Sequence, residues 1–524
     1  MLYDGLRLMV SNLIRAWIGH DERVLRGLNL CILINDVQRM GRGSKENDMQ
    51  AYDFEPACWS VKADGLDDID ECPVGLLSFD GMSAPELNII RGYLVSEHIP
   101  EDGGLGFDFH FHKEAVFGLS RDRKYYVLRD VQGRNAVPTS LAFDGQAIYG
   151  QSIIVANRKI DVNPAISELT VDLSGFREWI GKRFYKPDQD GGRKLEFSYP
   201  IETPENILLY KNEDLEIHAN HFAKQDGGYD AFFEFSFKET WRLNVKILSS
   251  EGMPLDSVLE KYFEPFERLL TFCMGFPGNI EEITFTGVDP AVSGRYFDRY
   301  VPGEKDRVNK LADNMPMPYS DLIGRFQDIA DKWMSATGYA RKACETATAL
   351  LGERGKLTDV MFLTCAHGFE AISRVGENPK ELADEEFKRR KDYVLENIKE
   401  DKIRRWANNK LEHANSVAAG ELASRLLAKL DGFADYVVPD GKLFLRQHRE
   451  SRNAYTHLRE SDSSDFMEGS DLYWHARATQ VLQYGAVMLY LGFQPSEVLS
   501  VFEEKNFLEG YIRVSREMYS KKQY

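Results

Sequence analysis

The chain is poor in cysteine and has no apolar run of membrane length, and both absences exclude classes of protein. Its six cysteines form no Cys-x-x-Cys pair, so we expect neither a structural zinc site nor a disulfide-stabilised secreted domain. The most apolar stretch, Val481 to Phe493, includes Gln483 and is shorter than the roughly 20 residues that a membrane helix needs. The sequence therefore predicts a cytoplasmic protein that does not associate with membranes.

Motifs of several common enzyme classes are also missing. The chain has no Gly-x-x-x-x-Gly-Lys-[Ser/Thr] phosphate loop and no Gly-x-Gly-x-x-Gly between a strand and a helix, which removes the two simplest nucleotide-binding sites. His-Glu-x-x-His and Gly-x-Ser-x-Gly are absent too, so the usual zinc proteases and serine hydrolases are not supported. We expect no cofactor and no metal ion.

Positive charge is scarce in the chain as a whole. Lys and Arg number 65 against 83 Asp and Glu, a net charge of −18, which argues against a protein that coats nucleic acid indiscriminately. Residues 388–410 are an exception, with nine basic against four acidic side chains. This stretch either provides phosphate contacts or forms a solvated helix with i,i+4 ion pairs. Its candidate RNA-binding residues are Lys388, Arg389, Arg390, Arg404 and Arg405.

The period of the hydrophobic pattern changes near residue 315. Before it, apolar and polar residues alternate, as in Leu169 to Leu173, which predicts an antiparallel sheet or sandwich. One helix with an apolar face is expected at 259–273, kinked or restarted by Pro265. After residue 318 the period of 3.6 predicts a helical bundle. The expected helices are 320–335, 338–352, 357–375, 381–398, 400–416, 419–434, 441–459, 471–491 and 496–518.

The expected fold class is therefore α+β, in three parts. Residues 1–45 form an amphipathic helix and arm, because apolar residues from Leu2 to Trp17 recur at helical spacing. Residues 46–315 form the β-rich domain, and residues 316–524 form the all-α domain.

One strand of the β-rich domain carries two histidines. The segment from Phe107 to Glu114 places His110 and His112 on one face and phenylalanines on the other. Alternating imidazoles can hold a metal, which makes an enzyme domain that binds carbohydrate or metal one alternative. The other is the solvated face of a half-buried strand.

A second basic stretch, residues 441–460, combines groups that suit RNA chemistry. On a helix of about 100° per residue, the basic and amide side chains of its polar face fall along one stripe with a histidine. Imidazole can transfer a proton at a ribose 2′-OH, while guanidinium groups bind phosphate and stabilise developing negative charge. A charged helix face without chemistry is the alternative. The stripe consists of Arg446, Arg449, Asn453 and His457.

The sequence of this stretch resembles the motif of a known family. Arg452-Asn453-Ala-Tyr455-Thr-His457 matches the Arg-Asn-x-x-x-His signature of HEPN domains, which are helical bundles. Upstream, the apolar stripe from Phe362 that precedes Glu370 is similar to a helix of the ApeA-like branch. The β-rich half has three further landmarks that resemble the N-terminal domain of ApeA-type anti-phage proteins. They are the segments 73–79, 176–179 and 265–277.

The resemblance implies a metal-independent endoribonuclease that acts as an effector of abortive infection. It implies proton transfer by His457, phosphate stabilisation by Arg452 and positioning by Asn453, with attack of the 2′-OH giving a 2′,3′-cyclic phosphate. Glu370 and Tyr455 are expected to be structural or to support the site, while Arg446, Arg449 and His448 are second-rank RNA contacts.

The expected partners follow from the same resemblance. They are RNA, with tRNA among the candidates, a phage protein as trigger, and a second copy in a homodimer or higher homo-oligomer. The β-rich domain would sense the invader or restrain the nuclease. A helical module that binds RNA or protein without catalysis is the alternative.

Overall fold

The structure is a computed structural model, and it describes most residues between Tyr52 and Ser520. The expected N-terminal helix and arm, residues 1–45, lie outside the described residues. The described ranges are 52–66, 72–80, 83–92, 94, 110–135, 146–182, 186–190, 194–198, 206–226, 236–298, 315–351, 357–377, 380–412, 414–457 and 463–520.

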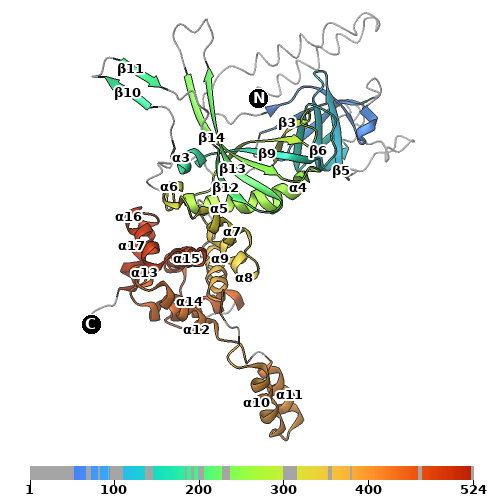
Figure 1. The fold of residues 1–524 in the computed structure, drawn as a ribbon. Helices are drawn as coiled ribbons and strands as arrows, with labels where there is room; N and C mark the ends of the chain where they lie inside the picture. Colours follow the sequence, from blue (N-terminus) through green and yellow to red (C-terminus); the bar gives the residue numbers. More distant parts are fainter. Residues whose placement is uncertain are drawn as a thin grey trace, which may run out of the picture. The chain divides into compact units, whose positions relative to one another are not determined.

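The β-rich half is built on one large sheet of 15 strands, drawn in blue to green in Figure 1. Its main path runs β12-β13-β14-β9-β16-β17-β8-β6-β5-β2-β3-β4-β7, and the registered pairs along it are antiparallel. The predicted antiparallel sheet is therefore confirmed. The strands of the path are β2 (Ala57–Ser60), β3 (Val74–Phe79), β4 (Glu86–Arg91), β5 (His110–Ser120), β6 (Tyr125–Asn135), β7 (Gln146–Tyr149), β8 (Ser152–Ala156), β9 (Ala165–Leu173), β12 (Ile207–Lys211), β13 (Leu215–Asp226), β14 (Ser236–Ile247), β16 (Ile280–Gly287) and β17 (Ser293–Asp298).

One end of this sheet closes on itself. Strand β7 pairs with β4 through Ile148 opposite Leu87, and it also pairs with β6 through Ile148 opposite Gly133. Because β6 continues through β5, β2 and β3 back to β4, these six strands form a closed antiparallel barrel. The remaining strands extend from β6 through β8 as an open sheet that ends at β12. Two short strands, β1 (Tyr52–Asp53) and β15 (Met253–Pro254), pair at its side, and β10 (Lys186–Asp190) pairs separately with β11 (Lys194–Ser198).

Short helices cover the open sheet. Helix α3 (Phe176–Ile180) buries Phe176 and Trp179, and α4 (Leu255–Val258) continues through a π-helical turn (Leu259–Phe263) into α5 (Glu264–Met274). Pro265 is the second residue of α5 and directly follows the π-helical turn, and such a local change in hydrogen bonding lets a helix accommodate the missing N–H of a proline. The helix therefore continues through Pro265 rather than restarting there.

The second half is all helical, as predicted. Its long helix α15 is buried over most of its length, whereas α14 buries only one stripe of side chains. The helices are α6 (Tyr319–Leu322), α7 (Phe326–Met334), α8 (Gly338–Thr348), α9 (Thr358–Ser373), α10 (Asp384–Glu396), α11 (Asp401–Leu411), α12 (Ala419–Leu430), α13 (Gly432–Val437), α14 (Gly441–His457), α15 (Gly469–Leu491), α16 (Pro495–Glu504) and α17 (Glu509–Tyr519).

Three predicted helices are each two helices. The predicted helix 320–335 breaks at Gly324, whose φ is +83°, and 419–434 breaks at Asp431, whose φ is +46°. The predicted helix 496–518 breaks before Leu508, whose φ is +56°. A left-handed residue cannot continue a right-handed helix, and neither Asp nor Leu reveals such a φ by its side-chain type.

The two halves share one apolar core. The indole of Trp179 in α3 donates to the carbonyl of Met317 at 2.8 Å, and the indole of Trp333 in α7 donates to the carbonyl of Pro265 at 2.9 Å. The hydroxyl of Tyr484 in α15 donates to the carbonyl of Phe272 in α5. The last two contacts tie α5 of the β-rich half to the helical half. Within the described residues, no helix is long and apolar enough to cross a membrane.

Candidate active site

Helix α14 carries the HEPN-like motif, and its two faces differ sharply. The carbonyl and carboxylate of Asp440 accept hydrogen bonds from the N–H groups of Phe444 and Leu443, both at 3.0 Å, which caps the helix start. The buried stripe consists of Phe444, His448, Ser451 and Ala454. The predicted polar stripe, Arg446, Arg449, Asn453 and His457, is exposed.

Arg452 lies between these two faces and is held by a carboxylate of the neighbouring helix α9. Its Nη2 contacts Glu370 Oε2 at 3.0 Å, while Glu370 Oε1 contacts Arg374 Nη2 at 2.8 Å. The second nitrogen, Arg452 Nη1, donates to Asn453 Oδ1 at 3.3 Å. The structure thus brings Glu370, Arg452 and Asn453 together.

The charge state of Glu370 follows from these contacts. Burial raises the pKa of its carboxyl, but hydrogen bonds and charge from Arg374 and Arg452 outweigh burial, so the pKa lies below its ordinary value. Glu370 is therefore ionised at neutral pH. A fixed carboxylate of this kind orients the guanidinium of Arg452 and leaves its other donors for a second anion.

A cavity of about 70 Å³ lies beside this ion pair. It is far smaller than the roughly 300–1,000 Å³ of a ligand pocket, so it cannot enclose a nucleotide. A ligand of that size could contact α14 only from its exposed side. The cavity is lined by Phe369, Glu370, Ser373, Ala419, Gly420, Ala423, Leu445, His448, Arg449, Arg452 and Asn453.

His457 is the last residue of α14, and its side chain is exposed. It has no hydrogen-bond partner among the described residues, which resume at Ser463. Asn453 lies one turn before it on the same side of the helix, but Arg452 lies about 140° around the helix axis. Along one helix, the imidazole and the guanidinium of the motif therefore point in different directions.

His448 is buried, so the prediction that it contacts RNA is wrong. Only 9% of the residue is exposed, and its Nδ1 lies 3.2 Å from Nε2 of His475, whose Nδ1 lies 2.5 Å from the hydroxyl of Tyr519. Burial lowers the pKa of His448 to about 4, with Glu370 opposing this shift and Arg452 adding to it. The signal in the sequence was its four-residue spacing from Phe444, which marks the apolar face.

Tyr455 packs beside the motif. Its ring contacts Phe362 edge-on at 5.9 Å and stacks on Phe466 at 5.6 Å, and its hydroxyl donates to the carbonyl of Met467 at 3.3 Å. Ser451 Oγ accepts from the N–H of Met467 at 3.0 Å. These contacts hold the segment that follows residue 463 against α14.

The other residues predicted to contact RNA differ in whether they already form ion pairs within the protein. Arg446 forms an exposed ion pair with Asp465 at 3.3 Å, whereas Arg449 has no ion pair among the described residues. In the basic stretch, Arg389 and Arg390 both bind Glu386, at 2.8 and 2.7 Å. Arg404 binds Asp401, while Lys388 and Arg405 are exposed and have no ion pair among the described residues. Local ion pairs thus occupy part of this stretch.

The β-rich half contains a larger cavity of about 490 Å³. His112 lies at its edge and pairs with Asp130 at 2.7 Å, with 63% of the imidazole side chain exposed. The side chain of His110 lies outside the described side chains. Among the residues described, no group of three or more His, Cys, Asp or Glu could hold a metal ion. The lining includes Glu114, Arg129, Asp256, Glu260, Phe263, Glu264, Ile283, Tyr296 and Asp298.

Comparison with known proteins identifies two families in the chain. The family described as ApeA N-terminal domain 1 matches residues 68–333, and the family described as Apea-like HEPN matches residues 363–497. No curated protein and no solved structure matches the chain significantly. The second match includes Glu370 and the motif from Arg452 to His457, and the first includes the larger cavity.

Proposed function

Since the chain belongs to the ApeA family of anti-phage proteins with a HEPN domain, we propose that it is a metal-independent endoribonuclease that stops phage growth by cleaving RNA. The observation that carries the proposal is the ion pair between Glu370 and Arg452 beside Asn453, on the helix that ends with the exposed His457. A guanidinium fixed in direction and an accessible imidazole are the two groups that phosphodiester cleavage through the 2′-OH needs.

The proposed reaction conserves protons. An imidazole removes the proton of the ribose 2′-OH, the 2′-oxygen attacks phosphorus, and the bond to the 5′-oxygen breaks. The leaving 5′-oxygen takes a proton, and the products are a 2′,3′-cyclic phosphate and a 5′-OH. Arg452 stabilises the charge that gathers on the phosphoryl oxygens, and Asn453 positions the phosphate or the imidazole.

Two copies of the chain complete the proposed site. Because Arg452 and His457 point about 140° apart on α14, one helix cannot direct both at the same phosphate. Nor can one imidazole serve as base and acid on opposite sides of phosphorus at once. A homodimer in which two α14 helices face each other would supply an imidazole and a guanidinium on each side of the phosphate that is cleaved.

Further RNA contacts are proposed outside the motif. Arg449 is exposed and free of ion pairs among the described residues, and Arg446 keeps donors beyond its single contact with Asp465. The basic stretch contributes Lys388, Arg389, Arg390, Arg404 and Arg405.

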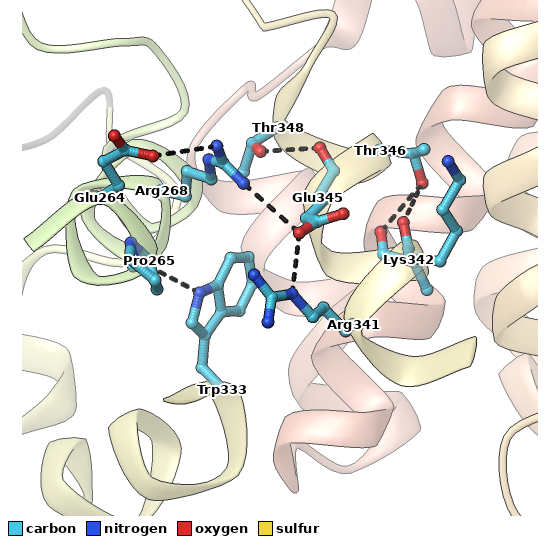
Figure 2. A network of polar contacts seen from close by, with 10 residues as sticks. Glu264, Pro265, Arg268, Trp333, Arg341, Lys342, Glu345, Thr346 and Thr348 are labelled. Atoms are coloured by element: carbon cyan, nitrogen blue, oxygen red, sulfur yellow. Dashed lines mark hydrogen bonds and ion pairs between the residues drawn. The ribbon is translucent and has the colours of Figure 1, made fainter. Parts of the chain in front are cut away.

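The β-rich half is proposed to sense the phage or to restrain the nuclease. The support is a chain of charges that leads from its cavity to the helical half (Figure 2). Arg268 on α5 contacts Glu264, a lining residue of the 490 Å³ cavity, at 3.6 Å, and it contacts Glu345 on α8 at 3.4 Å. Helix α8 packs on α9, the helix that carries Glu370. A ligand that rearranged Glu264 would therefore act on a helix adjacent to the site.

The test uses purified full-length protein and a labelled RNA. We expect cleavage that persists in EDTA and is lost in His457→Ala and in Arg452→Ala, with cyclic phosphate at the new 3′ ends. The matched control is His367→Ala, which removes an exposed histidine of α9 and should leave cleavage unchanged. Full cleavage by His457→Ala would refute the proposal, and RNA binding without turnover in the wild type would favour a non-catalytic module.

A further inference from the structure

Helices α10 and α11 form a hairpin that buries very little of its own surface. None of the residues of α10 is buried, and α11 buries only Ala407. The base of the hairpin is firmly held: Asn415 exchanges side-chain hydrogen bonds with the backbone of Leu382, at 2.8 and 2.9 Å. The hairpin is therefore well anchored at its base, while the surface of both helices is open to a partner (Figure 1).

Two large aromatic rings lie on this open surface. Tyr393 on α10 is 70% exposed and Trp406 on α11 is 62% exposed. Trp406 is the most exposed tryptophan among the described residues. Indole rings carry a large apolar area and are normally covered at least in part, so an exposed ring on each helix indicates that the hairpin contacts a partner.

Basic side chains flank the ring of α11 on both sides. Lys402 and Lys410 precede and follow Trp406 by four residues each, and all three side chains are exposed, so they form one stripe along the helix. Neither lysine takes part in an ion pair among the described residues. On α10, Arg389 and Arg390 precede Tyr393 by one turn and keep donors beyond their bonds to Glu386.

This alternation of rings and cations favours nucleic acid over protein as the occupant. Residues 388–410 carry five more basic than acidic side chains in a chain of net charge −18. Protein interfaces are depleted in lysine, whereas surfaces for single-stranded nucleic acid combine cations for the backbone with aromatic rings on which bases stack. Paired bases are already stacked and cannot lie on such rings.

We propose that the α10–α11 hairpin is a docking platform for unpaired RNA. Bases stack on Trp406 and Tyr393, and the backbone phosphates between them lie on Lys402 and Lys410. That the ligand is RNA rests on the proposed ribonuclease function. The inference adds the class of RNA substrate, which is one with an unpaired segment, such as a loop, that binds the hairpin while α14 acts on a neighbouring phosphate.

The experiment measures binding separately from cleavage. Full-length protein with His457→Ala is titrated into a fluorescent single-stranded oligoribonucleotide and into a fully paired duplex of the same sequence. Removing one stacking ring should weaken binding of the single strand about 5- to 150-fold. We expect this loss for Trp406→Ala, a smaller loss for Trp406→Phe, and weak binding of the duplex throughout.

The matched control is Tyr149→Ala, which removes a 44% exposed ring of β7 outside the hairpin and should not alter binding. Unchanged affinity of the double variant Tyr393→Ala/Trp406→Ala would overturn the proposal. So would a change in oligomeric state on sizing of that variant, because the rings would then cover a protein contact.

Cleavage distinguishes this proposal from the proposed function. With His457 intact, Trp406→Ala should raise KM for a loop-containing RNA and leave kcat nearly unchanged. If the wild type binds single strands through Trp406 but cuts nothing, the nuclease proposal fails and the platform stands. If the wild type cuts RNA and Trp406→Ala cuts with the same KM, the platform fails and the nuclease stands.

Discussion

Glu370 and Arg452 come from helices far apart in the sequence, α9 and α14, and their side chains meet at 3.0 Å. The carboxylate is shared with Arg374, so it is bound on both oxygens. An arginine held in this way loses little side-chain freedom when it binds a phosphate, because its direction is already set.

Replacing Glu370 by Gln should therefore reduce both stability and cleavage. The substitution leaves Arg374 and Arg452 without their shared carboxylate, and we expect a loss of about 1–3 kcal/mol in the free energy of unfolding. We also expect a roughly tenfold fall in kcat, equivalent to about 1.4 kcal/mol. Urea unfolding and RNA cleavage measure the two effects.

Glu377→Gln is the control for that variant. Glu377 also binds two cations, Arg425 at 3.3 Å and Lys429 at 2.6 Å, but it does not touch the motif. Its replacement should leave kcat unchanged. Equal loss of kcat in both variants would mean that Glu370 has no specific part in positioning Arg452.

Stability should fall as the pH is lowered from about 6.5 to about 4, because His448 is buried in its neutral form. Its pKa in the folded protein is about 4, whereas an unfolded histidine titrates near 6.5. Below pH 6.5 the unfolded chain binds a proton at this histidine and the folded chain does not. This difference lowers the free energy of unfolding by about 3 kcal/mol by pH 4. Denaturant unfolding at several pH values measures the slope, and His448→Gln should reduce it, while the buried His475 keeps part of it because burial also lowers its pKa.

Mixed dimers should reveal whether two histidines serve one RNA. If each site needs His457 from both copies, mixing equal amounts of wild-type and His457→Ala chains with subunit exchange leaves about a quarter of the activity. Independent sites would leave about half. Cleavage rates after co-refolding or co-expression distinguish the two values.

Arg268→Ala should raise cleavage in the absence of phage if the β-rich half restrains the nuclease. The substitution removes the charge that bridges Glu264 and Glu345 across the two halves (Figure 2). Arg341→Ala is the matched control, since Arg341 binds the same Glu345 at 3.0 Å from within α8. Growth of cells that express each variant, with sequencing of RNA ends, measures the effect. Equal growth and equal cleavage would show that this contact carries no restraint.

Local hydrophobic patterns were enough to predict an antiparallel sheet followed by a helical bundle, and to predict the helix that bears the motif. The four exposed residues from Arg446 to His457 were found from a spacing of three and four. His448 was predicted to contact RNA because it lies between two arginines in the sequence, and only the packing of His475, Phe362 and Phe369 around it reveals its burial.

Long-range pairing could not be predicted in the same way. The alternation of apolar residues indicates strands but carries no information on their neighbours, so closure of the barrel by β7 between β4 and β6 was not foreseen. Nor does any sequence pattern connect Glu370 to Arg452, which are separated by 82 residues. Both features arise from tertiary packing.

Closure of the barrel also leaves the large sheet with a single free edge on its main path. Strand β7 is paired on both sides, so the path ends only at β12, which is bonded to β13 alone among the described strands. Helix α7 of the helical half packs on β12, and Gln327 donates to the carbonyl of Lys211 at 3.2 Å. An uncovered edge strand is a template for intermolecular pairing. We therefore expect that α7 protects this edge from intermolecular pairing, and that a β-rich half expressed without α7 associates through β12.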